Sequence, residues 1–377
     1  MSHTLPSSTA RTPAKVWLGA FAIGAVLLAL PFVLGATAGQ GWIRILNFAL
    51  LYVMLALGLN IVVGYAGLLD LGYVAFYAVG AYMFALMASP HLAETFEGFA
   101  AMFPNGLHTS IWLVIPLGML IAACTGVLLG FPVLRLRGDY LAIVTLGFGE
   151  IIRIFMNNLD APVNITNGPQ GINRIDTVKI GDWALGKPET ILDFRITGPE
   201  KYYYLLMLIV IAIIFICIRL QNSRVGRAWE AVREDEVAAK AMGINTRNIK
   251  LMAFGMGASF GGVAGCLFAS MQGFVSPESF GLSESIAILC MVVLGGMGHV
   301  PGVVAGALLL SIFPEVLRNV VVPIQQTLFG DVIVDPDAIR MLLFGIALVA
   351  VMIFRPEGLW PSKVRKRELH QSKEPQA

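Results

Sequence analysis

Charged residues are scarce in this sequence. Only 13% of its 377 residues are Asp, Glu, Lys or Arg, against about 25% in an ordinary soluble domain. The hydrophobic share is 57% and the mean hydropathy is +0.76, so the chain lacks the polar residues that would cover a water-exposed surface. This composition excludes a water-soluble protein and makes the lipid bilayer the expected surroundings of most of the chain. The net charge of +2 is too small to indicate a nucleic-acid partner.

Cysteine and histidine are also few. The four cysteines lie inside apolar runs and lack the close spacing of a zinc site or a disulfide framework. The five histidines are scattered through predicted tails and loops, without the paired titratable groups that a membrane-embedded enzyme needs. Residues 181–188 approach a phosphate-binding motif, but Pro188 stands where a magnesium-binding hydroxyl is required. We therefore expect no catalytic residue, no metal site and no cofactor bound by this chain.

Long apolar runs are abundant. A helix needs about 20 apolar residues to cross a bilayer, and runs that are apolar throughout favour helices over the alternating strands of a β-barrel. The sequence predicts an all-α, polytopic membrane protein with about ten transmembrane helices. The predicted spans are residues 16–37, 43–64, 67–88, 111–131, 140–157, 203–219, 250–270, 284–297, 300–321 and 339–354.

These spans divide the chain into an N-terminal tail (1–15), a transmembrane domain (16–354) and a C-terminal tail (355–377). Two long excursions leave the membrane, an outer loop at 158–202 and an inner loop at 220–249. Lysine and arginine concentrate in the inner loop, its flanks and both tails, as the positive-inside rule requires if both termini are cytoplasmic. The first apolar run is expected to be a retained helix and not a cleaved signal peptide.

Ten spans make two halves of five, and an odd number per half predicts that the halves have inverted orientations. Each half has a glycine-rich interruption, at 64–67 and at 295–298. Each interruption is either a broken helix on a transport path or a tight turn between two helices. Glycine ladders at 257, 261 and 265 and at 298, 302 and 306 predict close helix packing, with helix sliding during transport as the alternative.

Ionisable residues inside spans are functional candidates by default. Glu150 and Arg153 share one face of the fifth span, and Asp70 lies near the inner end of the third. Alternatively, Glu150 and Arg153 form a structural pair and Asp70 reaches the interface. The candidate residues of a translocation path are Gly64, Gly67, Asp70, Thr145, Gly147, Glu150, Gly295, Gly296 and Gly298.

The inner loop combines many charges with an apolar stripe. Its stripe residues Trp229, Val232, Ala239 and Met242 recur at helical spacing, and Gly243 is expected to end the helix. The stripe either docks into a groove of a soluble partner or packs on the membrane domain of the same chain.

Three stretches, residues 58–73, 131–150 and 224–245, resemble the membrane permease subunits of bacterial ABC importers for branched-chain amino acids. Residues 272–280, 294–298 and 355–359 extend this resemblance. It implies that the inner loop couples the permease to its ATPases, with Glu236, Val237, Ala238, Ala239 and Gly243 similar to the family's coupling motif. The residues that we expect to couple are Gly226, Arg227, Glu230, Arg233, Glu236, Ala238, Ala239 and Gly243.

The resemblance also implies the partners and the function. It implies a second homologous permease, two ATP-binding-cassette ATPases that carry ATP and Mg, and a soluble periplasmic binding protein. The expected function is import of leucine, isoleucine and valine across the bacterial inner membrane by alternating access, along a mostly apolar path. Alternatives are a permease for urea or short amides, and an ion-coupled secondary transporter in which Glu150 is the coupling carboxylate.

Overall fold

The computed structural model describes residues 39–104, 106–134, 136, 138–180, 183–191 and 194–329, together with 24, 26–35, 37 and single residues between 342 and 360. The N-terminal tail, nearly all of the C-terminal tail, most of the tenth predicted span and part of the first lie outside these residues. Arg135 and Arg137 also lie outside them.

The described chain is helical, with two small hairpins in the outer loop. Its first half contains α2 (Gln40–Asn60), the π-helix η1 (Ile61–Tyr65), α3 (Val74–Met87), α4 (His91–Thr95), α5 (Glu97–Met102), α6 (Ile111–Val133), α7 (Asp139–Asn157) and the 3-10 helix η2 (Gly168–Gln170). The second part contains α8 (Gly198–Gln221), α9 (Arg224–Glu234), α10 (Glu236–Ala241), α11 (Thr246–Gln272), η3 (Pro277–Phe280), α12 (Leu282–Gly295) and α13 (Val300–Phe329). The strands β1 (Lys179–Ile180) and β2 (Trp183–Ala184) form one antiparallel pair, and β3 (Glu189–Ile191) and β4 (Phe194–Ile196) form another.

Six helical segments of the described chain are long and apolar enough to cross a membrane: Gln40–Tyr65, Ile111–Val133, Gly198–Gln221, Thr246–Gln272, Pro277–Gly295 and Val300–Asn319. Each contains or overlaps one predicted span. The predicted spans at 67–88 and 140–157 coincide with the helices α3 and α7, of 14 and 19 residues. The all-α class is confirmed, whereas the count of ten spans and the inverted halves stay predictions.

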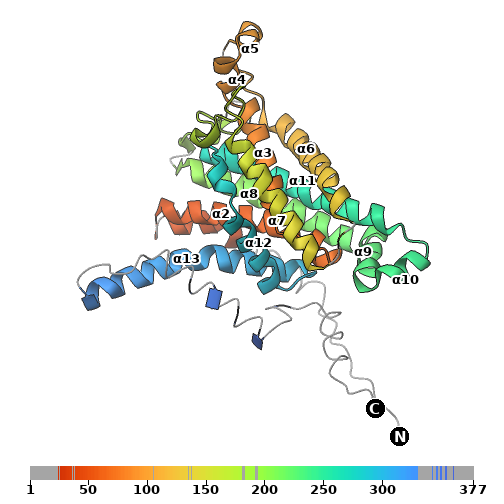
Figure 1. Cartoon of the computed structure of the whole chain (residues 1–377). Coiled ribbons are helices and arrows are strands. Elements are labelled where there is room, and N and C mark those ends of the chain that lie inside the picture. The colour runs from red at the N-terminus through yellow and green to blue at the C-terminus, as the bar shows by residue number, and fades with distance from the viewer. Residues whose placement is uncertain are drawn as a thin grey trace.

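The helix α11 is the centre of the bundle. It packs against α6, α3 and α2, and 83% of its span is buried. Figure 1 shows α11 beside α6, with α4 and α5 projecting at the top of the view and α9 and α10 lying apart from them on the right. The close packing that the glycine ladders predict is present, since a Cβ on Gly257 would lie 2.9 Å from the Gly58 carbonyl oxygen and one on Gly306 2.7 Å from the Gly295 Cα.

Replacing Gly80 with leucine is expected to destabilise this packing. A Cβ on Gly80 would overlap the backbone carbonyl of Gly262 on α11, so α3 and α11 would have to separate. Overpacking of this kind costs about 1–3 kcal/mol, and for a chain of this length we expect the apparent Tm of the detergent-purified protein to fall by about 2–4 °C. The control is Gly147→Leu, because nothing lies within 4 Å of a Cβ there. Equal Tm values for the two variants would contradict the packing argument.

Several predicted span boundaries differ from the structure, among them the beginnings of the third and the sixth spans. The third span was expected to begin at residue 67, but residues 66–73 are irregular and α3 begins at Val74. Gly67 has φ +68°, outside the helical region, and Gly72 lies so close to the Thr145 carbonyl that a Cβ would overlap it. The helix α8 begins at Gly198, five residues before the predicted 203, because Thr197 and Glu200 form a capping box.

The inner loop was expected to form one helix, but it forms two. Asp235 has φ −151° and ψ 108°, which is extended backbone, and its Oδ1 accepts hydrogen bonds from Val237 N (2.8 Å) and Ala238 N (3.0 Å). It therefore ends α9 and caps α10. The predicted stop at Gly243 is confirmed, since Gly243 has φ +86° just after α10.

Candidate coupling and translocation site

The two glycine-rich interruptions meet in the folded chain. The first is the end of α2, where a π-helix replaces the α-helix at Ile61–Tyr65 and irregular backbone follows. The second is the turn between α12 and α13. Asn60 joins them, because its buried Oδ1 accepts a hydrogen bond of 2.8 Å from Gly298 N. We call Asn60, Gly64 and Gly298 the glycine junction.

The junction requires glycine. A Cβ on Gly64 would overlap Asn60 Oδ1 and lie 2.6 Å from Gly298 N, so it would break the hydrogen bond between the two interruptions. Gly298 has φ +82° and Gly296 has φ +108°, a region that residues with a side chain rarely adopt. Gly295 packs against Gly302, since a Cβ on Gly295 would lie 2.7 Å from the carbonyl carbon of Gly302. The first interruption is thus a broken helix and the second is a tight turn.

Arg233 connects the inner loop to this junction. From α9 its Nη1 donates a hydrogen bond of 2.7 Å to the Gly64 carbonyl, and a Cβ on Gly298 would lie 3.3 Å from the same nitrogen. The aliphatic part of Arg233 also covers Gly67, where a Cβ would lie 2.7 Å from its Cγ. Gln221, at the end of α8, donates from Nε2 to the Gly298 carbonyl at 3.2 Å. Movement of α9 would therefore be transmitted directly to both interruptions.

The apolar stripe of the inner loop packs mainly on the same chain. Trp229 is fully buried, stacks on Tyr65 with ring centroids 6.4 Å apart, and donates from Nε1 to the Ile249 carbonyl at 2.7 Å. Val232 and Ala239 are buried as well. Of the two alternatives for the stripe, the contacts of these three residues favour packing on the membrane domain. Met242, at 84% exposed, is the exception.

Apart from the exposed Lys240, the outward surface of α10 is apolar. Val237 is 69% exposed, and Ala238, Ala241 and Met242 are also exposed. We call these four residues the α10 patch. Lys250 Nζ, buried on α11, lies 2.7 Å from Glu236 Oε2 and holds α10 against the bundle. The ion pair therefore fixes the position of α10 and of the α10 patch. An exposed apolar surface of this kind is suited to binding a soluble partner.

The other expected coupling residues have separate places. Gly226 is buried where α9 begins, and a Cβ there would overlap the carbonyl oxygens of Leu220 and Gln221. Arg227 and Glu230 are exposed on α9, and Arg227 Nη1 donates to the Asn222 carbonyl at 3.2 Å. Their role in coupling stays a prediction.

Two other path candidates, Asp70 and Thr145, lie together. Asp70 is buried, and its Oδ1 accepts from Gly72 N at 2.9 Å. Thr145 Oγ1 accepts from Leu71 N and donates to the Ala142 carbonyl, both at 3.0 Å. These bonds fix the irregular segment 66–73 against α7. Asp70 is therefore enclosed by the protein, and both alternatives for its role stay predictions.

Glu150 and Gly147 lie outside the glycine junction. Glu150 Oε2 is 2.9 Å from Arg153 Nε, and Arg153 Nη1 is 3.9 Å from Glu278 Oε1. This contact agrees with the alternative that Glu150 and Arg153 form a structural pair. Gly147 faces open space, since a Cβ there would have nothing within 4 Å. The structure thus joins Gly64, Gly67 and Gly298, and separately Asp70 and Thr145, but does not join Gly147 or Glu150 to either group.

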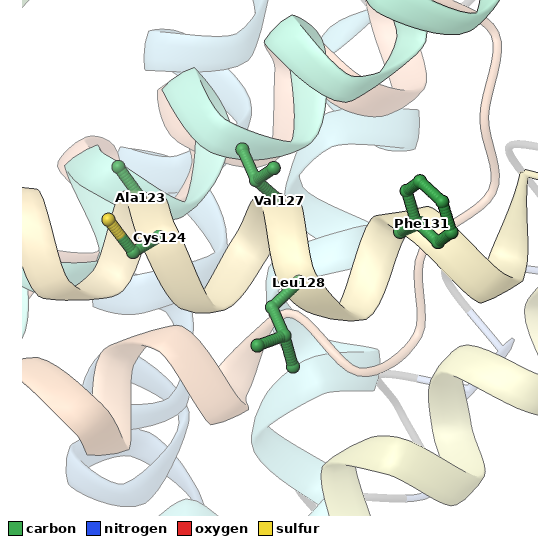
Figure 2. A pocket seen from close by; sticks show the side chains of 5 residues that line it. All are labelled: Ala123, Cys124, Val127, Leu128 and Phe131. Carbon is green, nitrogen blue, oxygen red and sulfur yellow. The ribbon is translucent and has the colours of Figure 1, made fainter.

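A hollow of about 470 Å³ lies on the outside of α6. Figure 2 shows that Val127 points from α6 toward the neighbouring helix and Leu128 points the opposite way, with Ala123, Cys124 and Phe131 completing the lining. These side chains bring no charged group to the hollow. Since binding sites need convergent polar groups for orientation, the hollow is better suited to lipid tails than to an amino acid.

Sequence reasoning missed Asn60 and Gln221, which complete the hydrogen bonds of the glycine junction. A signal for Asn60 was present, because an amide side chain inside an apolar run needs a partner inside the protein. Gln221 gave no such signal, since it stands at the polar end of a span.

The fold and the site define a polytopic α-helical membrane protein in which a broken helix meets a glycine turn, and broken helices are typical of transport paths. The comparison with known families is more specific. Residues 41–352 match the family described as branched-chain amino acid transport system, permease component. The chain belongs to this family.

Several curated relatives are similar over most of the chain. The high-affinity branched-chain amino acid transport system permease protein LivM of Escherichia coli K12 is 42% identical over 359 residues, 92% of this chain and 75% of LivM. LivM of Salmonella typhimurium is 41% identical over the same shares. The permease protein LivH of Salmonella typhimurium is 26% identical over 265 residues, 69% of this chain and 80% of LivH. No solved structure matches significantly.

Proposed function

We propose that this chain is a permease subunit of an ATP-driven importer that moves leucine, isoleucine and valine across the bacterial inner membrane by alternating access. It performs no covalent chemistry in this proposal. ATP and Mg bind to two partner ATPases, a second homologous permease completes the path, and a soluble periplasmic binding protein delivers the substrate. Both termini lie in the cytoplasm, on the side of the inner loop.

The observation that carries the proposal is the hydrogen bond from Arg233 on α9 to the Gly64 carbonyl. It connects a charged, solvent-facing loop to backbone that is already broken inside the bundle. A partner that binds the α10 patch and moves α9 would change the geometry of both interruptions, which is how a remote binding event opens or closes a path. The names of the relatives support the choice of branched-chain amino acids.

The test is uptake of radiolabelled leucine into proteoliposomes that contain this chain, the second permease and the two ATPases, with binding protein outside. We expect uptake that requires ATP and that unlabelled isoleucine or valine inhibits. Inhibition by urea or acetamide alone would favour the permease for urea or short amides. Leucine uptake by this chain alone on an ion gradient, without ATP, would favour the secondary transporter.

The α10 patch gives a more local prediction. Met242→Asp places a charge on an 84% exposed apolar side chain, and its desolvation at an interface is unfavourable. We expect the purified permease to lose most of its affinity for the ATPases, about tenfold or more in Kd, as measured by co-purification at graded salt and protein concentration. The matched control is Asn248→Asp, which adds the same charge at an exposed position outside the patch. Equal binding of the ATPases by both variants would show that the α10 patch is not the docking surface.

A further inference from the structure

A second cavity, partly open to the surface, lies between helices of the bundle and away from the glycine junction. Its volume is about 210 Å³, and side chains of α2, α3, α11, η3 and α12 line it. This is below the range of about 300–1,000 Å³ that is usual for drug-sized ligands, so the cavity is suited to a smaller molecule. It contains one carboxylate, that of Glu284, in the first turn of α12.

Glu284 is an acidic residue within the candidate span Pro277–Gly295. Tyr52 Oη donates a hydrogen bond of 2.8 Å to its Oε2. Among the described residues, no lysine or arginine forms an ion pair with Glu284, unlike Glu150 and Glu236, which each have a basic partner. A carboxylate in a helical bundle without a basic partner is suited to a cation that comes and goes.

The rest of the wall is mostly apolar. Phe48, Leu51 and Leu55 face the cavity from α2, and Phe268 faces it from α11. A carboxylate and a phenol at one side of an aliphatic and aromatic surface complement a molecule that has an ammonium group next to a branched hydrocarbon chain. We propose that this cavity is an amino-acid binding site on the transport path, in which Glu284 and Tyr52 hold the α-ammonium group and the apolar wall holds the side chain.

This site deepens the proposed function and rests on it. The sequence predicts a mostly apolar path with backbone groups as transient hydrogen-bond partners, because a lone ionised group would hold a zwitterion too tightly. Glu284 is not a lone ionised group, because its carboxylate already accepts the hydrogen bond from Tyr52. The ammonium group of a bound amino acid would therefore be only one of the partners of this carboxylate, and it can leave without stranding the charge. The sequence does not predict Glu284 as a site residue, because it is the first residue of a predicted span, where a charge is common.

The experiment measures protection of a thiol in the cavity. Ser279, which lines it, is changed to cysteine in a Cys124→Ser background, since Cys124 is the exposed cysteine and Cys217, Cys266 and Cys290 are buried. The importer complex is labelled with a small maleimide in the presence of leucine, of 3-methylbutylamine, which keeps the ammonium group, or of 4-methylpentanoate, which keeps the carboxylate. We expect the first two compounds to slow labelling and the third to have little effect.

Glu284→Gln is the decisive variant. It keeps the shape of the side chain and removes the charge, so the leucine concentration that halves labelling should rise by about tenfold or more. Glu284→Asp should keep most of the protection, and Glu278→Gln, the same substitution at a 70% exposed carboxylate, should leave it unchanged. If Glu284→Gln does not assemble, Tyr52→Phe replaces it, with an expected rise of several-fold.

The outcomes separate this proposal from the proposed function. Equal protection by leucine and 4-methylpentanoate, or unchanged protection in Glu284→Gln and Tyr52→Phe, would overturn the ammonium site while leucine uptake by the wild-type importer continued. Absence of leucine uptake by the complete wild-type importer would overturn the proposed function itself.

Discussion

Leucine uptake by the reconstituted importer is expected to be abolished by the substitution Gly64→Ala. The added methyl group would overlap Asn60 Oδ1 and press on Gly298 N at 2.6 Å. It would therefore break the hydrogen bond that joins the two interruptions and displace backbone that Arg233 contacts. Losing a buried hydrogen bond while overpacking the same place costs about 2–5 kcal/mol, enough to fix the junction in one arrangement or to disrupt it.

The matched control is Gly41→Ala. Gly41 is also on α2, but nothing lies within 4 Å of a Cβ there, so a methyl group meets open space. Both variants should insert and co-purify with the second permease at similar yield, which separates a defect in transport from one in assembly. Normal uptake by an assembled Gly64→Ala variant would show that the junction does not need its close approach.

The second large effect concerns Arg233→Ala. This change removes the hydrogen bond from α9 to the Gly64 carbonyl but leaves the α10 patch and the burial of Trp229 in place. Because hydrogen bonds that involve a charged group contribute about 1.5–3 kcal/mol, we expect leucine uptake to fall by about tenfold or more. The ATPases should still bind and hydrolyse ATP, so the number of leucine molecules moved per ATP should drop.

Arg224→Ala provides the comparison, since it removes an equal charge from an exposed position on the same helix. Measuring uptake and ATP hydrolysis on the same proteoliposomes distinguishes uncoupling from loss of ATPase binding. A parallel decrease of both rates in Arg233→Ala, or an identical decrease in Arg224→Ala, would mean that Arg233 has no special part in transmission.

Much of the fold could be predicted because membrane helices are encoded by composition. Nine of the predicted spans coincide with or overlap described helices, the short helix Val26–Gly35 among them, and both glycine-rich interruptions are present, since only glycine permits the close approaches that the structure shows there. The pairing of Glu150 with Arg153 was foreseeable as well, because their spacing of three places them on one helical face.

The rest depended on information that periodicity does not contain. Asp235 divides the inner loop into two helices because its side chain accepts hydrogen bonds from the first backbone N–H groups of α10. Such local bonds compete with a continuous helix, and the spacing of apolar residues gives no information about them. The rotation of α7 about its axis decides that Thr145 faces the irregular segment and Gly147 does not. The meeting of Asn60 with Gly298, residues 238 positions apart, is a tertiary contact that a single sequence does not specify.

The central place of α11 has a consequence for how the protein is made. Its partners α2, α3 and α6 all precede it in the chain, and during synthesis the N-terminal segments emerge first. Those three helices therefore enter the membrane before the helix that fills the space between them exists. Until α11 is synthesised, the glycine-rich surfaces of these three helices lack the helix on which they pack. A chain whose synthesis stops before Thr246 is therefore expected to be loosely packed and sensitive to proteases.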